Sequence, residues 1–508
     1  MSNKLFKNLV TSIFTYGLAF GISFFLSPYI TKQLGVEANG FVTLANQFVG
    51  YIALITVALT SMASRFISVN IYRNDFEKAN TYYNSVLGAS AILVTVISFI
   101  VGPLICNLEK IINISPRLIW DVKVLFFVVF LNFCLGLLFE VFTIATYVSN
   151  RLYLSSIRSI EGNIIRCCFI ILAYTCFETK MYYISVAAMV SALYTYLWNI
   201  HYTRKYLPQL CIRIKYFKKE AIVELLSAGS WNIVIQLNNI LNTGLDLLLS
   251  NWILGESSMG ILAVAKTIPT SISTMLNSVS GVFLPEMTQA YAENNMERFV
   301  VIVRRSIKIL ALIFNIPVVF LIVYGGDFYR LWQPSLPNRM LQILSLLTIC
   351  TILVSGSTAA VFGIFTITNR LKYHSITSVV FGVINTVVVI ILLNFVPIEH
   401  GVYVVAGISS LLITLRNYVI TFPYAAKCIS QKWYIFHLPS FKTIFGVAIS
   451  SLLCFGIRFL FIPKEWFTLF LSGVIVVFVS IIINTFIVLQ KEDREYLCEI
   501  IKKKIIHK

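Results

Sequence analysis

The chain has 508 residues, of which 58% are hydrophobic and 12% are charged, and its mean hydropathy is +0.83. A soluble globular domain carries about 25% charged residues. The composition therefore excludes a soluble enzyme, a disordered chain and a secreted disulfide scaffold, and it indicates an integral membrane protein. The net charge of +18 is then typical of Lys and Arg gathered in cytoplasmic loops, and no nucleic-acid partner is expected.

Fourteen stretches of the chain are apolar enough to cross a bilayer, which takes about 20 residues. They are too long for barrel strands and do not alternate apolar with polar residues. We therefore predict an all-α polytopic membrane protein with about 14 transmembrane helices. The predicted spans, in chain order, are 8–30, 41–68, 84–105, 123–148, 159–177, 182–202, 224–253, 259–285, 306–325, 341–368, 376–396, 402–425, 442–462 and 467–489.

Basic residues set the expected orientation. With the N-terminus inside, 27 Lys and Arg residues fall in inner segments and eight in outer segments. This bias predicts that both termini are cytoplasmic and that the number of spans is even. Twelve spans therefore remain an alternative to fourteen.

The two halves of the chain resemble each other at an offset near 220 residues. Since the repeat contains six spans, both copies insert in the same orientation, related by an axis along the membrane normal. We predict a six-helix bundle over 1–220, a second over 221–440, two further spans over 441–490 and a basic cytoplasmic tail over 491–508. The matching positions are Leu34, Gly35, Gly40 and Ala45 with Leu254, Gly255, Gly260 and Ala265, Asn74, Glu77 and Lys78 with Asn294, Glu297 and Arg298, and Asn150, Arg151 and Leu152 with Asn369, Arg370 and Leu371.

Several kinds of chemistry have no sequence signature. A G-x4-G-K-[ST] loop is missing, so the chain is not expected to hydrolyse ATP. The ten cysteines form no C-x-x-C pair, and the five histidines have no partner at catalytic or metal-binding spacing. We expect no catalytic residue, no metal and no cofactor. A membrane polysaccharide polymerase is a less favoured alternative, because the large outer loop typical of such enzymes is missing.

Charged residues inside spans are candidates for function, since each costs about 2.5–3.5 kcal/mol on insertion scales. Asp246 and Lys266 flank the short turn between the seventh and eighth spans, and antiparallel helices would bring them to similar depth. Glu140 and Arg166 flank an inner loop in the same way. A purely structural ion pair is the alternative for Asp246 and Lys266.

Two more arginines, Arg65 and Arg416, lie toward the inner ends of the second and twelfth spans. Together with Arg166 they either face a cavity or extend toward the inner headgroups. The sequence leaves both readings open.

The seventh span carries an unusual number of polar side chains. Positions 232, 236, 239, 243 and 246 recur at helical spacing and share one face, and Asn242 adds a further amide. Amides suit sugar hydroxyls, so Asn232, Gln236, Asn239 and Asn242 are predicted to line a substrate cavity. Hydrogen bonding between helices is the alternative.

The first span ends in Pro28-Tyr29-Ile30-Thr31-x2-Leu34-Gly35-x4-Gly40. With the repeat and the number of spans, this motif resembles polysaccharide exporters of the multidrug/oligosaccharidyl-lipid/polysaccharide superfamily, and more narrowly Wzx-type flippases. The resemblance implies a V-shaped, alternating-access transporter in the bacterial cytoplasmic membrane. It also implies the substrate, an undecaprenyl-pyrophosphate-linked oligosaccharide of O-antigen, capsule or exopolysaccharide, which moves from the inner to the outer leaflet.

The candidate residues fit that substrate. Arg65, Arg166, Lys266 and Arg416 would bind the pyrophosphate. Glu140 and Asp246 would bind a coupling ion, H⁺ or Na⁺, unless the substrate gradient alone drives transport. The resemblance further implies contacts with membrane lipids, a polysaccharide polymerase and a chain-length regulator. A multidrug or cationic-solute antiporter and a lipid II flippase of the same superfamily remain alternatives.

Overall fold

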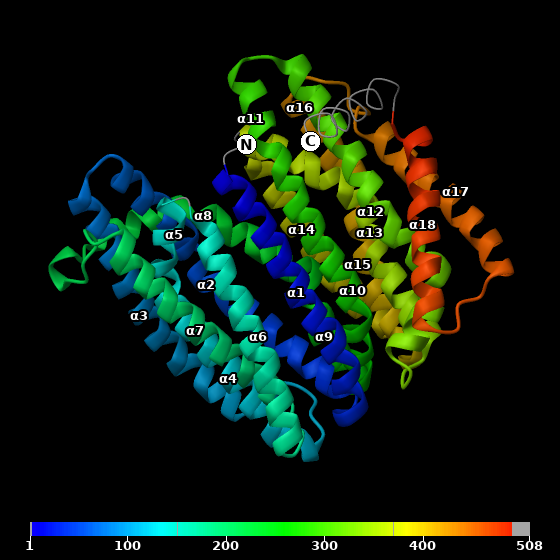
Figure 1. The fold of residues 1–508 in the computed structure, drawn as a ribbon, viewed down its shortest axis with the longest axis horizontal. Helices are drawn as coiled ribbons and strands as arrows, with labels where there is room; N and C mark the ends of the chain where they lie inside the picture. Colours follow the sequence, from blue (N-terminus) through cyan, green and yellow to red (C-terminus); the bar gives the residue numbers. More distant parts are fainter. Residues whose placement is uncertain (1–2, 150, 369, 490–508) are drawn as a thin grey trace. The chain divides into compact units, whose positions relative to one another are not determined.

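The computed structural model describes residues 3–149, 151–368 and 370–489, and Figure 1 draws their path. These residues form helices joined by short connections, and no strand occurs among them. The predicted all-α fold class is therefore confirmed. The basic tail predicted over 491–508 lies outside the described residues.

The chain divides into two compact units, residues 1–260 and 261–508. The first unit thus includes the helix from Lys219, which the repeat assigns to the second copy, so the domain boundaries drawn from the repeat stay a prediction. The helices are α1 (Asn3–Leu34), α2 (Val36–Tyr72), α3 (Phe76–Cys106), α4 (Ile119–Phe139), α5 (Ile144–Val148), α6 (Leu152–Cys176), α7 (Tyr183–Tyr206), α8 (Lys219–Asn239), α9 (Asp246–Leu249), α10 (Glu256–Ser280), α11 (Leu284–Ala292), α12 (Met296–Trp332), α13 (Asn338–Ile367), α14 (Leu371–Leu393), α15 (Ile398–Arg416), α16 (Phe422–Cys428), α17 (His437–Leu460) and α18 (Trp466–Ile487).

Each predicted span falls on helical residues, but fewer than fourteen helices in the described part of the chain meet the test for a membrane span. Within the described residues, 11 helices are long and apolar enough to cross a membrane, or up to 12 if the bent α13 is one span. Helix α8 is not among them, since its polar side chains lower its mean hydropathy. The chain is therefore a multi-pass membrane protein whose predicted count of fourteen is not confirmed.

The internal repeat reappears in the backbone geometry. Gly35 and Gly255 have φ angles of 88° and 91°, a region that an L side chain rarely adopts. Asn74 and Asn294 have φ angles of 60° and 54°, and the residue after each caps the next helix with its side chain. Equivalent positions 220 residues apart thus make the same turns, as a duplication would produce.

Two equivalent glycines of the repeat also touch each other. A methyl group on Gly40 would lie 2.9 Å from the Cα of Gly260, and one on Gly260 would overlap the Val36 carbonyl. The N-terminal ends of α2 and α10 therefore pack backbone against backbone. Small residues at helix contacts of this kind are typical of membrane proteins.

Polar contacts attach the last two helices to α12. Asn315 donates a hydrogen bond to Asn484 of α18 over 2.8 Å. The buried Asp327 pairs with Arg458 of α17 over 2.8 Å and with Arg330 over 3.3 Å. These contacts explain how helices outside the repeat belong to the second unit.

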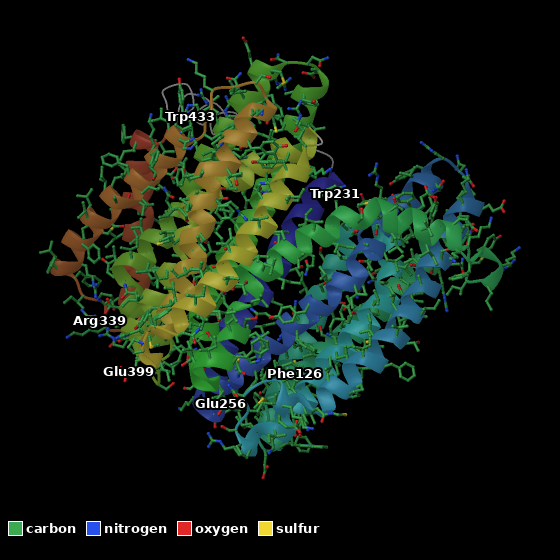
Figure 2. The ribbon with its side chains drawn as sticks, turned by 180° about the vertical axis from the view of Figure 1, so that it is seen from behind. Phe126, Trp231, Glu256, Arg339, Glu399 and Trp433 are labelled. Carbon is green, nitrogen blue, oxygen red and sulfur yellow. The ribbon has the colours of Figure 1, made fainter. Side chains whose placement is uncertain are left out.

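Labelled side chains locate the ends of the second unit. Figure 2 shows Arg339 and Glu399 at one end and Trp433 at the other. The first two lie in connections predicted outside and the third in a connection predicted inside. The alternation agrees with the predicted topology, while which side is cytoplasmic stays a prediction.

Candidate functional site

A cavity of about 450 Å³, which we call the Glu140 cavity, lies within the first unit among α2, α4, α7 and α8. Such a volume falls within the range of small-molecule sites. The lining combines one carboxylate with two amides, three threonine hydroxyls and a phenol. The residues that line it are Ala53, Thr56, Val57, Thr60, Asn132, Phe133, Gly136, Leu137, Glu140, Thr143, Tyr196 and Gln236.

Helix α4 supplies the polar floor of this cavity. Asn132, Gly136 and Glu140 are four residues apart and therefore lie on one helix face. A methyl group on Gly136 would lie 3.1 Å from the Tyr196 hydroxyl, so glycine leaves room for the phenol. Helix α4 ends at Phe139, and Glu140 begins a single turn of 3₁₀ helix before α5. Such a turn within a span often marks a functional position.

The lining of the Glu140 cavity is rich in hydrogen-bond acceptors. The hydroxyls of Thr56 and Thr143 donate to backbone carbonyls over 3.2 and 2.7 Å, which leaves their oxygen lone pairs as acceptors. The Asn132 side-chain oxygen is buried and accepts no hydrogen bond. With the Glu140 carboxylate, this surface suits hydroxyl groups, ammonium groups or a cation, and it disfavours a phosphate.

The polar stripe of the seventh span contacts α2. The Asn232 amide donates to the Ser61 hydroxyl over 2.9 Å, and the Gln236 amide donates to the Gly50 carbonyl over 3.2 Å. Gln236 also lines the Glu140 cavity. It therefore fits both interpretations of the stripe, as cavity lining and as a source of hydrogen bonds between helices. Asn239 is exposed, and the side chain of Asn242 lies outside what the structure describes.

The four candidate cations differ in environment. Arg65 is exposed on α2, and Arg166 is half-buried on α6 with its Nε unpartnered. Lys266 and Arg416 are buried on α10 and α15. Arg65 and Arg166 belong to the first unit and Lys266 and Arg416 to the second, and the shared role of the four stays a prediction.

Arg416 has the least satisfied guanidinium among the described arginines. It is 8% exposed, and its Nε and Nη1 have no hydrogen-bond partner. Its Nη2 donates to the Asn417 side chain over 3.3 Å, where a turn of π-helix begins. The His374 imidazole, stacked on Phe365 at 4.7 Å, lies close enough to interact with it electrostatically. An unpaired buried cation is costly, so an anion is the ligand it would accept.

The two expected charge pairs have different outcomes. Within the described residues no ion pair joins Glu140 to Arg166, so that pairing is wrong for this structure. Helix α6, which carries Arg166, packs mainly against α1 and α7, whereas Glu140 shares the Glu140 cavity with residues of α2, α4, α7 and α8. Asp246 and Lys266 are both buried, but they belong to different units, and their pairing stays a prediction.

A set of hydrogen bonds, here called the clasp, ties the loop between α3 and α4 to the start of α10. Asn113 and Asn251 exchange hydrogen bonds of 2.7–3.0 Å through their amides and backbones. The Ser115 amide donates to Glu256, which Figure 2 labels, over 3.0 Å. The Trp252 indole donates to the Ile111 carbonyl over 2.6 Å. The clasp and the contact between Gly40 and Gly260 lie at the side predicted to be outside.

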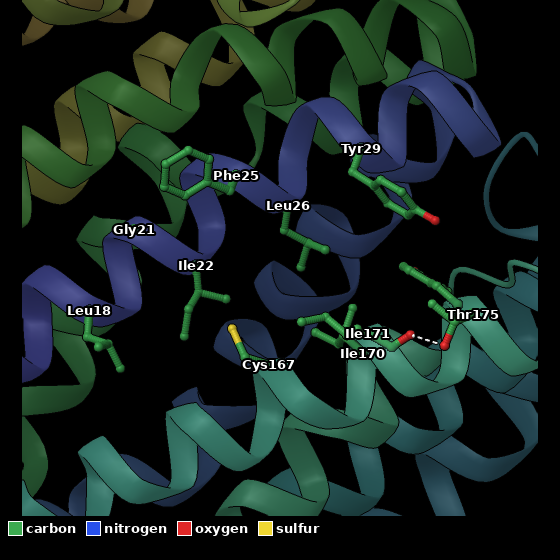
Figure 3. A pocket seen from close by; sticks show the side chains of 11 residues that line it. Leu18, Gly21, Ile22, Phe25, Leu26, Tyr29, Cys167, Ile170, Ile171 and Thr175 are labelled. Carbon is green, nitrogen blue, oxygen red and sulfur yellow. Dashed lines mark hydrogen bonds between the residues drawn. The ribbon is translucent and has the colours of Figure 1, made fainter.

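An apolar groove of about 520 Å³ runs between α1 and α6 (Figure 3). Leu18, Ile22 and Leu26 of α1 lie opposite Cys167 and Ile171 of α6. The Thr175 hydroxyl at one end donates to the backbone of α6 over 2.9 Å and so offers little polarity. Tyr29 and Tyr174 are the other polar residues of the lining, which contains no charged side chain, so the groove suits hydrocarbon chains.

Sequence reasoning found Glu140 and Gln236 but missed the other polar groups of the cavity. Asn132 was detectable, because it lies two steps of four residues before Glu140 in an otherwise apolar span. Thr56, Thr60 and Tyr196 carry no comparable signal, since hydroxyl residues are common in membrane helices. No group of three His, Cys, Asp or Glu residues in the described part of the chain is placed to hold a metal ion.

A comparison with known families decides the relationship. The polysaccharide biosynthesis protein family matches residues 5–291, more than half of the chain. The chain belongs to this family. Over nearly its whole length, this family member is also similar to the uncharacterized membrane protein EpsK of Bacillus subtilis strain 168. The two are 28% identical over 503 residues, with 98% of both chains covered.

Solved structures with the same fold are transporters of the MOP superfamily and the lipid II flippase MurJ. An inward-facing MATE multidrug transporter matches with a TM-score of 0.67 at 19% identity, covering 82% of this chain and 94% of its own. MurJ in an inward closed conformation matches with a TM-score of 0.66 at 14% identity, covering 94% and 98%. The expected transporter fold of this superfamily is therefore confirmed.

Proposed function

We propose that this protein is a flippase that moves an undecaprenyl-pyrophosphate-linked oligosaccharide from the inner to the outer leaflet of the bacterial cytoplasmic membrane. The oligosaccharide would be a repeat unit of O-antigen, capsule or exopolysaccharide. The family match over residues 5–291 carries the proposal, because it ties a transporter fold to polysaccharide biosynthesis. Both termini would be cytoplasmic, and a polymerase and a chain-length regulator would be partners.

The Glu140 cavity supports the sugar part of the substrate. Sugar hydroxyls donate hydrogen bonds, and Asn132, Glu140 and the threonines offer acceptors for them. Tyr196 and Phe133 add aromatic surface on which a sugar ring can pack. Gln236 is the residue of the amide stripe that contributes to this lining, and Asn232, Asn239 and Asn242 remain proposed contacts along the same helix.

The pyrophosphate would bind elsewhere. The acceptor-rich lining of the Glu140 cavity repels phosphate oxygens, so this group needs the cations. Among them, Arg416 has two guanidinium nitrogens without partners, which is the strongest support for phosphate contact. Arg65, Arg166 and Lys266 are proposed to contribute along the route. Glu140 and Asp246 remain the proposed carboxylates for a coupling ion.

Reconstitution would test the proposal. The purified protein is placed in liposomes that carry a lipid-linked oligosaccharide, and a membrane-impermeant glycosidase measures the fraction exposed on the outside. We expect exposure to rise from half of the lipid to nearly all of it with time. Liposomes with lipid II and liposomes that accumulate a cationic dye are parallel arms. Transport of lipid II alone, or of the dye alone, would replace the proposed function by the corresponding alternative.

The clasp predicts that the outer side must open during transport. In a variant without native cysteines, Ser115→Cys with Glu256→Cys should form a disulfide, because the native side chains are in hydrogen-bond contact. Oxidation should then lower transport by at least about tenfold, and a reductant should restore it. Each single-cysteine variant is the control. Undiminished transport in the oxidised double variant would show that this contact never needs to open.

Labelling of native cysteines tests the orientation. Cys106 is exposed at the end of α3, while Cys211 is partly covered and its thiol contacts Asn80. With both termini inside, an impermeant thiol reagent should label Cys106 in intact cells, and Cys211 only after permeabilisation. Cys428 is buried and is therefore unsuitable as an inner marker. Labelling of Cys211 in intact cells would reverse the topology.

A further inference from the structure

A second, much smaller cavity lies directly against Glu140. Its volume is about 10 Å³, enough for one water-sized occupant. Three oxygen-bearing side chains line it, those of Thr60, Ser64 and Glu140, and the rest of its wall is apolar. Thr60, Leu137 and Glu140 line this chamber and the Glu140 cavity alike. The Glu140 carboxylate therefore lies between the Glu140 cavity, which is large enough for a sugar, and this small chamber, which is large enough for an ion.

The charge of Glu140 has no counterpart nearby. Among the described residues it makes no ion pair with a Lys, Arg or His side chain. Glu140 is exposed where it faces the Glu140 cavity, and a carboxylate at such a position within a membrane span is a candidate for binding a proton or a cation. At Phe139 the helix passes directly into the 3₁₀ turn that Glu140 begins, so the span is continuous and only its hydrogen-bond pattern changes there.

The oxygens of the chamber are free to accept a cation. The Thr60 hydroxyl is only 3.4 Å from the Thr56 carbonyl, a long hydrogen bond that leaves its lone pairs available. The repeat gives an internal comparison: the position equivalent to Glu140 is Ala360, where α13 continues as a helix. The carboxylate therefore occurs in the first copy of the repeat and is missing from the second.

We propose that Glu140, Thr60 and Ser64 form a Na⁺ site. The inference rests on the proposed function for its role in transport, but the site itself is a property of the first unit. Na⁺ is favoured over a proton because three oxygen-bearing side chains line one ion-sized space, which protonation of one carboxylate does not require. Since Glu140 and Thr60 also face the larger cavity, Na⁺ and the sugar share two ligands. Binding of Na⁺ therefore changes the affinity for the sugar, and binding of the sugar changes the affinity for Na⁺. Such coupling is what Na⁺-driven transport of the oligosaccharide requires.

Thermal unfolding of the purified protein, without any lipid-linked substrate, tests the site. NaCl is titrated against KCl and choline chloride at constant ionic strength. We expect Na⁺ alone to raise the unfolding midpoint by about 2–4 °C. Glu140→Gln should remove this shift, and Thr60→Val or Ser64→Ala should raise the half-saturating Na⁺ concentration by about tenfold. Thr56→Val is the matched control, because Thr56 lines the larger cavity but not the chamber.

The outcomes separate the site from the function. No Na⁺ effect in the native protein, or an equal effect of K⁺ and choline, would overturn the proposal. The midpoint of thermal unfolding could instead be independent of Na⁺ but dependent on pH, with the pH dependence lost in Glu140→Gln. That result would also overturn the Na⁺ proposal and make Glu140 a proton site. If Na⁺ binds as expected while the liposomes flip no lipid-linked oligosaccharide, the proposed function fails and the Na⁺ site stands.

Discussion

Arg416→Met is expected to raise the thermal stability of the protein and, at the same time, to abolish transport. The native guanidinium is buried with two unpartnered nitrogens, so an apolar side chain of similar length removes an uncompensated charge. Replacing buried ionic groups by hydrophobic ones is often neutral or stabilising by about 1–4 kcal/mol. If Arg416 binds the pyrophosphate, the same change removes the anion site. Unfolding midpoints and the liposome assay measure the two effects separately.

Two variants sharpen the Arg416 result. Arg416→Lys keeps the charge but loses the paired N–H groups, so it should retain part of the transport activity. Arg339→Met removes an exposed arginine of the same unit and should leave stability and transport unchanged. Full transport in Arg416→Met would assign Arg416 a structural role only. Lower stability in that variant would mean that the buried guanidinium has a favourable partner in the resting protein.

Gly229→Ala is expected to destabilise the first unit and to lower transport with it. A methyl group at this position would overlap the backbone carbonyl of Ala58, where α8 crosses α2. A backbone group cannot move aside like a flexible side chain, so the two helices must separate. Overpacking of this kind costs about 1–3 kcal/mol. Because α2 and α8 both line the Glu140 cavity, the separation should also distort the sugar site.

The matched control is Gly456→Ala in α17. A methyl group there meets no atom within 4 Å, so the change should be neutral or stabilising by up to about 1 kcal/mol through the helix preference of alanine. Unfolding midpoints and the yield of monodisperse protein compare the two variants. An equally mild effect of both substitutions would show that α2 and α8 are not locked together at Gly229.

The sequence by itself determined the class of the protein, its helices and its turns. Hydropathy sufficed for the helices because a bilayer demands long apolar segments with internally satisfied backbones. Turn geometry was readable because few residues tolerate a positive φ, as Gly35 and Asn74 show together with their equivalents 220 residues later. The polar stripe of the seventh span was likewise visible, since amides are rare in a lipid-facing helix.

The tertiary structure decided which side chains share a site. Membrane helices are apolar on all sides, so the sequence does not fix how each one rotates against its neighbours. Equal distance from a loop suggested a pair of Glu140 and Arg166, whereas packing places Glu140 beside Thr60 and Asn132 instead. The partners of Glu140 come from helices far apart in the chain, and only the packing of α2 against α4 brings an orphan carboxylate and an ion-sized space together.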